Sequence, residues 1–160
     1  GPMKMGAIRQ FLTDVNWGLL DYLVVDLPPG TGDEALTIAQ IAPNVRGAVI
    51  VTTPQEVAVM DAIKAAKFIE HLDIPVLGVV ENMSGMICPH CHEEIDLFSK
   101  GGGKKAAEDL GVPYLGGIPM DPEMVKSGDE GKPFILQHKE SPTGKAVDAV
   151  MENLIRLVES

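Results

Sequence analysis

Short apolar runs alternate with amphipathic stretches along this chain of 160 residues. The runs are continuous, which is typical of strands that are covered on both faces, as in parallel sheets. They lie at residues 22–25, 48–51 and 76–80, with a weaker run at residues 114–118. The pattern therefore predicts four buried strands.

Between these runs, apolar residues recur at helical spacing. The spacing predicts helices over residues 5–15, 33–42, 54–72, 104–110 and 142–158. The third helix has the clearest start, because Thr53 can cap it, Pro54 suits its first position and Glu56 completes a capping box. Gly111 is expected to stop the fourth helix, and Ser141 to open the last one.

Strands that alternate with helices predict an α/β fold with right-handed crossovers, and the length predicts a single domain over residues 1–160. The formal net charge of -10 and an aromatic content of 4% argue against nucleic acid as a partner. No apolar run reaches the roughly 18 residues that a membrane helix needs, and the chain shows no basic-then-apolar leader. We therefore expect no membrane partner and a cytoplasmic location.

A phosphate-site signal follows the first apolar run. The run ends at Asp26, and in phosphate-transferring folds such a carboxylate holds Mg²⁺, usually through water. The sequence Leu27-Pro28-Pro29-Gly30-Thr31-Gly32-Asp33 comes next, and its glycines let backbone N–H groups approach an anion. A rigid turn without a ligand explains the same residues equally well.

The sequence contains no Walker A loop. The best partial match, Gly103-Lys104, is followed by Lys105, and Phe98 stands where the motif needs its leading glycine. No residue of this sequence is therefore expected to cradle a β- or γ-phosphate in the P-loop manner.

Cys88 and Cys91 are the two cysteines of the chain. Thiols at this spacing can hold one soft metal, but they supply half of a four-thiolate site. His90 and His92 lie too near the cysteines to coordinate easily together with both. A two-fold dimer would bring four thiolates together, which suits zinc or a [4Fe–4S] cluster. Zinc held with a histidine, and two thiols without a metal, stay open as alternatives.

Together, these motifs resemble the Mrp (ApbC-like) family, whose members are iron–sulfur cluster carrier ATPases of the MinD-like, deviant Walker A group. The motifs that carry the resemblance are, in chain order, Gly1-Pro2-Met3, the stretch from Asp21 to Asp33, Val51-Thr52-Thr53-Pro54-Gln55, Val80-Glu81-Asn82-Met83-Ser84, Cys88-Pro89-His90-Cys91, Gly101-Gly102-Gly103 and Ile118-Pro119-Met120-Asp121-Pro122. The resemblance covers essentially the whole chain.

The resemblance implies a role for each motif. Asp26 would be the Walker B carboxylate on water-bound Mg²⁺, and Pro29, Gly30 and Thr31 would belong to the switch segment that senses the γ-phosphate of ATP. Asn82 would hydrogen-bond adenine, with Pro119, Met120 and Asp121 lining the base pocket. Cys88 and Cys91, in a loop over residues 83–100, would hold a [4Fe–4S] cluster across a homodimer, with zinc as a possible substitute.

The resemblance also implies a fold and a function. The fold would be the three-layer, mainly parallel sheet of MinD-like P-loop NTPases, and the function would be transfer of iron–sulfur clusters to apo-proteins. Family members carry their glycine-rich loop, with its signature lysine, on a strand that precedes all the motifs seen here. We therefore expect this chain alone to be inactive as an ATPase. We also expect an open sheet edge that leads to dimerisation, domain swapping or a rearranged sheet.

Two further functions compete with the carrier. One is a zinc-stabilised interaction module without catalysis. The other is a partitioning-type ATPase whose thiols are incidental.

Overall fold

The computed structural model describes residues 2–30, 32–42, 44–88, 91 and 93–160. Its helices are α1 (Pro2–Thr13), α2 (Asp33–Ile41), α3 (Glu56–Glu70), α4 (Gly102–Leu110), α5 (Pro122–Asp129), α6 (Phe134–Gln137) and α7 (Pro142–Val158). Its strands are β1 (Ala48–Thr52), β2 (Val76–Ile87), β3 (Glu94–Ile95) and β4 (Tyr114–Met120).

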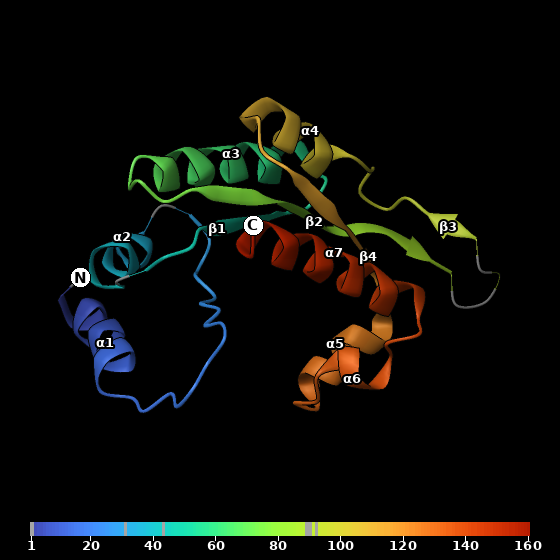
Figure 1. Cartoon of the computed structure of the whole chain (residues 1–160). Coiled ribbons are helices and arrows are strands. Elements are labelled where there is room, and N and C mark those ends of the chain that lie inside the picture. Colours follow the sequence, from blue (N-terminus) through green and yellow to red (C-terminus); the bar gives the residue numbers. More distant parts are fainter. Residues whose placement is uncertain (1, 31, 43, 89–90, 92) are drawn as a thin grey trace.

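The sheet is built around β2. Strands β1 and β4 flank it in parallel, and β3 pairs antiparallel with its last two residues, Met86 and Ile87. Helices α3 and α4 cover one face of the sheet and α7 covers the other (Figure 1). The predicted three-layer, mainly parallel α/β architecture is therefore confirmed.

Two apolar clusters hold these layers together. Val79 packs with Ala62 and Ala66 of α3, whereas the next residue, Val80, packs with Leu115 of β4 and Val150 of α7. Successive side chains of a strand point to opposite faces, so β2 contributes to both clusters. The apolar run at residues 76–80 is continuous because both of its faces are covered.

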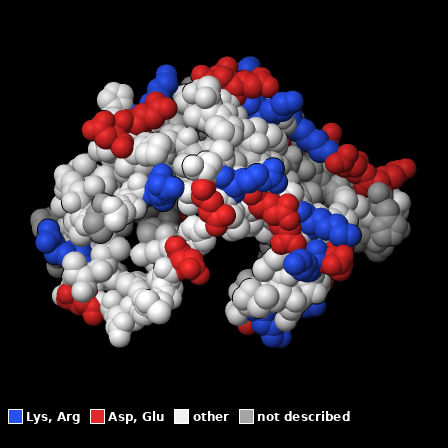
Figure 2. Space-filling view, viewed as in Figure 1, with Lys and Arg blue, Asp and Glu red and all other residues white. Residues whose placement is uncertain are grey.

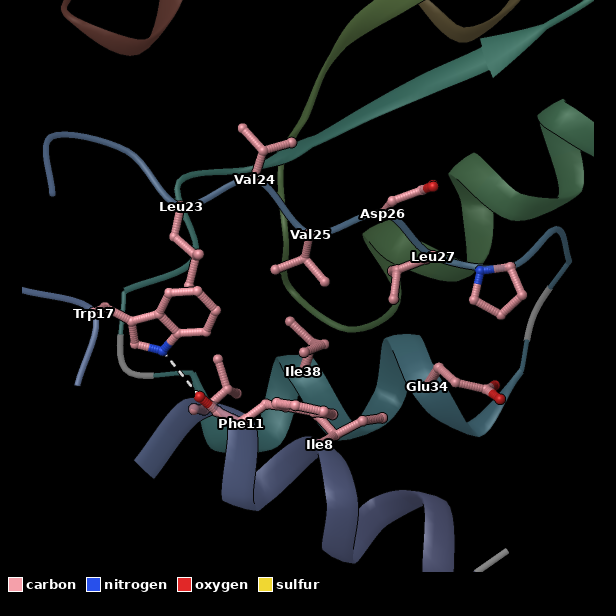
Figure 3. Close-up of a pocket in the computed structure, with 12 residues that line it drawn as sticks. Ile8, Phe11, Trp17, Leu23, Val24, Val25, Asp26, Leu27, Glu34 and Ile38 are labelled. Carbon is pink, nitrogen blue, oxygen red and sulfur yellow. Dashed lines mark hydrogen bonds between the residues drawn. The ribbon is translucent and has the colours of Figure 1, made fainter. Parts of the chain in front are cut away.

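The strand predicted at residues 22–25 is wrong. These residues have no regular secondary structure and lie outside the sheet, and the side chain of Val24 is 84% exposed. An apolar run forms a strand only where a neighbouring backbone completes its hydrogen bonds. Instead, the segment runs beside α1 and α2, and Val25 points toward Ile38 of α2 (Figure 3). Among the described residues, no strand pairs with the outer edge of β1, so the expected open edge is present.

The predicted capping box is also wrong. Helix α3 begins at Glu56 with Gln55 as its N-cap, and no side chain caps it. Thr53 lies two residues before this N-cap, and its hydroxyl donates to the side-chain oxygen of Gln55. Pro54 accordingly precedes the helix rather than opening it.

Two other helix signals are confirmed. Gly111 ends α4 in the left-handed conformation, with φ 67°. The Ser141 hydroxyl accepts a hydrogen bond from the Gly144 N–H (2.9 Å) at the start of α7.

Candidate cluster-binding hairpin and nucleotide edge

The two cysteines lie at the turn between β2 and β3. The Cys88 N–H donates to the Glu93 carbonyl (2.9 Å), and this bond closes the turn just beyond the Ile87–Glu94 pair. Cys88 is half-buried and Cys91 is exposed. The hairpin projects beyond the helices that cover the sheet (Figure 1). A soft metal held there would therefore be accessible to a second molecule.

An ionic contact holds the chain as it returns from the hairpin. The Lys100 ammonium pairs with the carboxylates of Glu94 and Asp96, the latter at 3.2 Å. The hydrogen bond to Glu94 raises the pKa of Lys100 above its usual value. Gly85 has a φ of +73°, and a Cβ there would lie 2.6 Å from the Cε of Lys100. The left-handed backbone is what favours glycine here, because the flexible end of the Lys100 side chain could move away from a Cβ.

Behind this contact lies a buried carboxylate that the sequence reasoning missed. Glu81 of β2 is 1% exposed. It accepts hydrogen bonds from the Ser84 hydroxyl (2.6 Å), the Gly101 N–H (3.2 Å) and the Gly103 N–H (2.6 Å). The available signal was an acidic residue directly after an apolar strand run, because charged side chains are buried only with partners.

The residues predicted to contact adenine lie together at one edge of the sheet. Asn82 of β2 pairs with Ile118 of β4, which places Asn82 beside the chain from Pro119 to Asp121. The side-chain oxygen of Asn82 accepts the Met83 N–H (2.9 Å). The Asp121 carboxylate accepts the Glu123 N–H (2.9 Å) and caps α5. Their proposed role in binding a base stays a prediction.

Asp26 lies elsewhere. It is exposed and lines a cavity of about 320 Å³ with Glu34 and mostly apolar side chains of α1, α2 and residues 17–28. Its carboxylate points away from the apolar side chains (Figure 3). The expected strand end is absent at Asp26, because residues 22–25 do not join the sheet. Pro29 and Gly30 are also exposed, and Thr31 lies outside the described residues.

Within the part of the chain that the structure describes, no group of three His, Cys, Asp or Glu side chains is arranged to hold a metal ion. His90 and His92 lie outside that part. The described thiols thus provide two soft ligands at an exposed turn. The Cys91 thiol has the Glu93 carboxylate as a distant acceptor at 3.9 Å.

The described part of the chain also contains no helix long and apolar enough to cross a membrane.

The chain is similar to curated proteins that are named for carrying or assembling iron–sulfur clusters. An iron–sulfur cluster carrier protein of Methanocaldococcus jannaschii is 54% identical over 136 residues, which are 85% of this chain and 47% of the relative. A Trichoplax adhaerens protein named as a cytosolic Fe–S cluster assembly factor is 48% identical over 157 residues, 97% of this chain and 59% of the relative. The chain thus spans about half the length of these relatives.

Solved structures agree with the fold. A nucleotide-binding protein of Archaeoglobus fulgidus, in complex with ADP, is 44% identical with a TM-score of 0.71, and the match covers 81% of this chain and 53% of that one. The cell division ATPase MinD of Pyrococcus furiosus is 25% identical with a TM-score of 0.67, covering 98% and 59%. The MinD-like fold class is therefore confirmed. A family model described as ParA, NUBPL iron-transfer P-loop NTPase, matches residues 1–155, and the chain belongs to this family.

Proposed function

We propose that this chain binds an iron–sulfur cluster through Cys88 and Cys91 and delivers it as cargo to apo-proteins. The observation that carries the proposal is the position of the two thiols at the exposed turn of the β2–β3 hairpin. The names of the relatives as carriers and assembly factors support it.

In this proposal, two copies of the chain share one [4Fe–4S] cluster. Two thiolates from each copy complete the four ligands that such a cluster takes. A two-fold axis beside the hairpin would bring the two pairs of thiols together. An exposed cluster between two copies is also within reach of an acceptor protein, which transfer requires.

Nucleotide would act through the edge formed by Asn82 and residues 119–121. We propose that adenine binds there and that Asp26 positions Mg²⁺ through water, with Pro29, Gly30 and Thr31 responding to the γ-phosphate. The chain has no Walker A loop of its own, so we expect no ATP hydrolysis by the chain alone. A cytoplasmic location is part of the same proposal.

Anaerobic reconstitution with ferrous iron and sulfide tests the cluster site. We expect about four irons and four sulfides per dimer, the content of one bridging [4Fe–4S] cluster. Cys88→Ser and Cys91→Ser should each abolish iron binding and dimerisation together. Leu97→Ser introduces the same residue at an exposed position of the same loop and should leave both unchanged.

Two outcomes would reject the carrier. Iron uptake that is unchanged in a chain without cysteines would make the thiols incidental, as in a partitioning-type ATPase. A monomer that takes up stoichiometric zinc but no iron would favour the zinc-stabilised interaction module. Zinc found after aerobic purification decides nothing, because zinc readily occupies empty thiolate sites.

A further inference from the structure

We propose that Glu81 is a positioning residue that holds together the two ends of the cysteine loop, residues 83–100, whose first residues belong to β2. The inference rests on the proposed cluster-binding function, which it deepens by naming what holds Cys88 and Cys91 in place. In this role Glu81 is not a metal ligand. It acts through the two ends of the loop.

The hydrogen bonds of Glu81 connect the start and the end of the loop. One carboxylate oxygen accepts both the Ser84 hydroxyl (2.6 Å) and the Gly101 N–H (3.2 Å). The other oxygen accepts the Gly103 N–H (2.6 Å). Ser84 precedes the cysteines and Gly101 follows them, so the two ends of the loop meet at one side chain.

Both oxygens of the Glu81 carboxylate accept hydrogen bonds. Two of the three donors are backbone N–H groups, which cannot act as acceptors, and the third is the Ser84 hydroxyl. Gly101 is the N-cap of α4, where the helix dipole favours a negative charge. Glu81 also sits on the central strand, in register with Thr52 of β1 and Gly117 of β4. The carboxylate therefore belongs to the central strand of the sheet.

The three glycines that follow the loop, Gly101, Gly102 and Gly103, lie where a larger residue would not fit. A Cβ on Gly103 would lie 2.8 Å from the Cβ of Glu81, and a Cβ on Gly102 would clash with the carbonyl of Pro54. Gly101 has a φ of +86°, which disfavours any other residue. The run of three glycines is thus explained by the left-handed backbone at Gly101 and by the close approach of Gly102 to Pro54 and of Gly103 to β2.

Fixing the loop ends should matter for the cluster because ligands that are already positioned lose less conformational entropy on binding. With the ends released, Cys88 and Cys91 would sample a wider range of positions. The simplest competing explanation is that Glu81 only stabilises α4. The two explanations differ in what happens when α4 is destabilised from its other end.

The test compares Glu81→Gln with Gly111→Ala. Glutamine keeps the size of the side chain but replaces one of the two acceptor oxygens with an NH2 group, which cannot accept from the backbone N–H that it faces. Gly111→Ala strains the opposite end of α4, where the backbone is left-handed, and leaves Glu81 intact. Both variants should lower stability. Ser84→Ala removes a single bond and is the milder variant, in case Glu81→Gln does not fold.

Two readouts are measured: the rate at which reconstituted chain loses iron to a chelator, and hydrogen exchange of residues 83–101 in the metal-free chain. We expect roughly tenfold faster iron loss and loop exchange in Glu81→Gln, as expected when hydrogen bonds to a charged group are lost. Ser84→Ala should give a smaller change in the same direction. Gly111→Ala should leave both rates at the wild-type value.

Wild-type rates in Glu81→Gln, or equal effects of Glu81→Gln and Gly111→Ala at matched stability, would overturn the positioning role. Failure of the proposed function looks different, because the wild-type chain itself would then take up no cluster. In that case the exchange measurement on the metal-free chain still decides whether Glu81 holds the loop.

Discussion

Residues 76–80 and residues 22–25 are both continuous apolar runs, yet the first lies at the centre of the sheet and the second lies outside it. Val79 and Leu115 of the sheet are 0% and 2% exposed, whereas Val24 and Leu19 are 84% and 105% exposed. Charged side chains gather over α3, α4 and the β2–β3 hairpin, and broad uncharged areas surround α1 and the segment that follows it (Figure 2).

The contrast shows that apolar composition does not by itself make a strand. Strand β2 has a hydrogen-bonded neighbour on each side and helices over both faces. The segment around residues 22–25 is tethered through exposed contacts, such as the hydrogen bond from the Tyr22 hydroxyl to Glu159 (2.7 Å). We therefore expect the sheet and the helices packed on it to unfold together. We expect the N-terminal region, which comprises α1, α2 and the segment between them, to be less stable.

Truncating one apolar side chain in each region should give the largest difference in the free energy of unfolding. Leu115→Ala removes a buried side chain between β2 and α7 and should lower the free energy of unfolding by about 2–5 kcal/mol. Val24→Ala should change it by no more than about 0.5 kcal/mol. Urea titration followed by far-UV circular dichroism measures both values. Similar losses for the two variants would show that residues 22–25 pack in the core in solution.

The single tryptophan provides a second test. Trp17 lies in the N-terminal region, 44% exposed, and its indole N–H donates to the Phe11 carbonyl (2.9 Å). Its fluorescence should change at a urea concentration about 1 M or more below the midpoint of the circular dichroism transition, because fewer buried contacts hold it. Coincident transitions would mean that the two regions unfold as one unit.

The parts of the fold that were predicted correctly are those where local and tertiary signals agree. Residues 142–158 combine a serine cap with an apolar face that packs on β2 and β4, and residues 104–110 end at a left-handed Gly111. The strand expected at residues 22–25 failed because its existence depends on another backbone beside it. That information is not present in residues 22–25 themselves. Short helix α5 was missed, although Asp121 and Pro122 form a recognisable start signal.

In the candidate site, too, the features that depend on neighbouring residues were predicted and those that depend on distant residues were not. The spacing of Cys88 and Cys91 pointed to one turn, because both thiols come from a single stretch of chain. Glu81 was missed because two of its three donors come from Gly101 and Gly103, far along the chain. A buried carboxylate becomes interpretable only when the fold brings its partners to it.

Removing the cap of α7 should lower the stability of the sheet region by a smaller amount and leave that of the N-terminal region unchanged. Ser141→Ala deletes the hydroxyl that accepts the Gly144 N–H and should cost about 1 kcal/mol of unfolding free energy. Gln55→Ala is the matched control, because Gln55 is the N-cap of α3 but makes no side-chain capping bond. The loss should appear in the circular dichroism transition and not in that of Trp17. A shift in both transitions would indicate that α7 supports the N-terminal region as well.

The smallest effect is expected from an ion pair within the N-terminal region. The Lys4 ammonium donates to the Glu34 carboxylate (2.8 Å) and joins α1 to α2. This hydrogen bond lowers the pKa of Glu34 below 4.5 and raises the pKa of Lys4 above 10.5. The contribution of Glu34 is therefore present above pH 4.5 and is lost as the pH falls through the folded-state pKa. The contribution of Lys4 is present below pH 10.5 and is lost as the pH rises through its folded-state pKa.

A comparison of the wild-type chain with Lys4→Met isolates the contribution of the Lys4–Glu34 ion pair. The carboxylates that do not contact Lys4 contribute equally to the pH dependence of both chains. The Trp17 midpoint of the wild-type chain should exceed that of Lys4→Met slightly at pH 7, and the difference should shrink as the pH falls below 4.5 through the lowered pKa of Glu34. High salt should also reduce it, because the pair is exposed to solvent. Lys64→Met, which breaks the exposed pair with Asp61 on α3, should leave the Trp17 midpoint unchanged. A difference that does not shrink as the pH falls below 4.5 would mean that Lys4 supports the N-terminal region by packing rather than by charge.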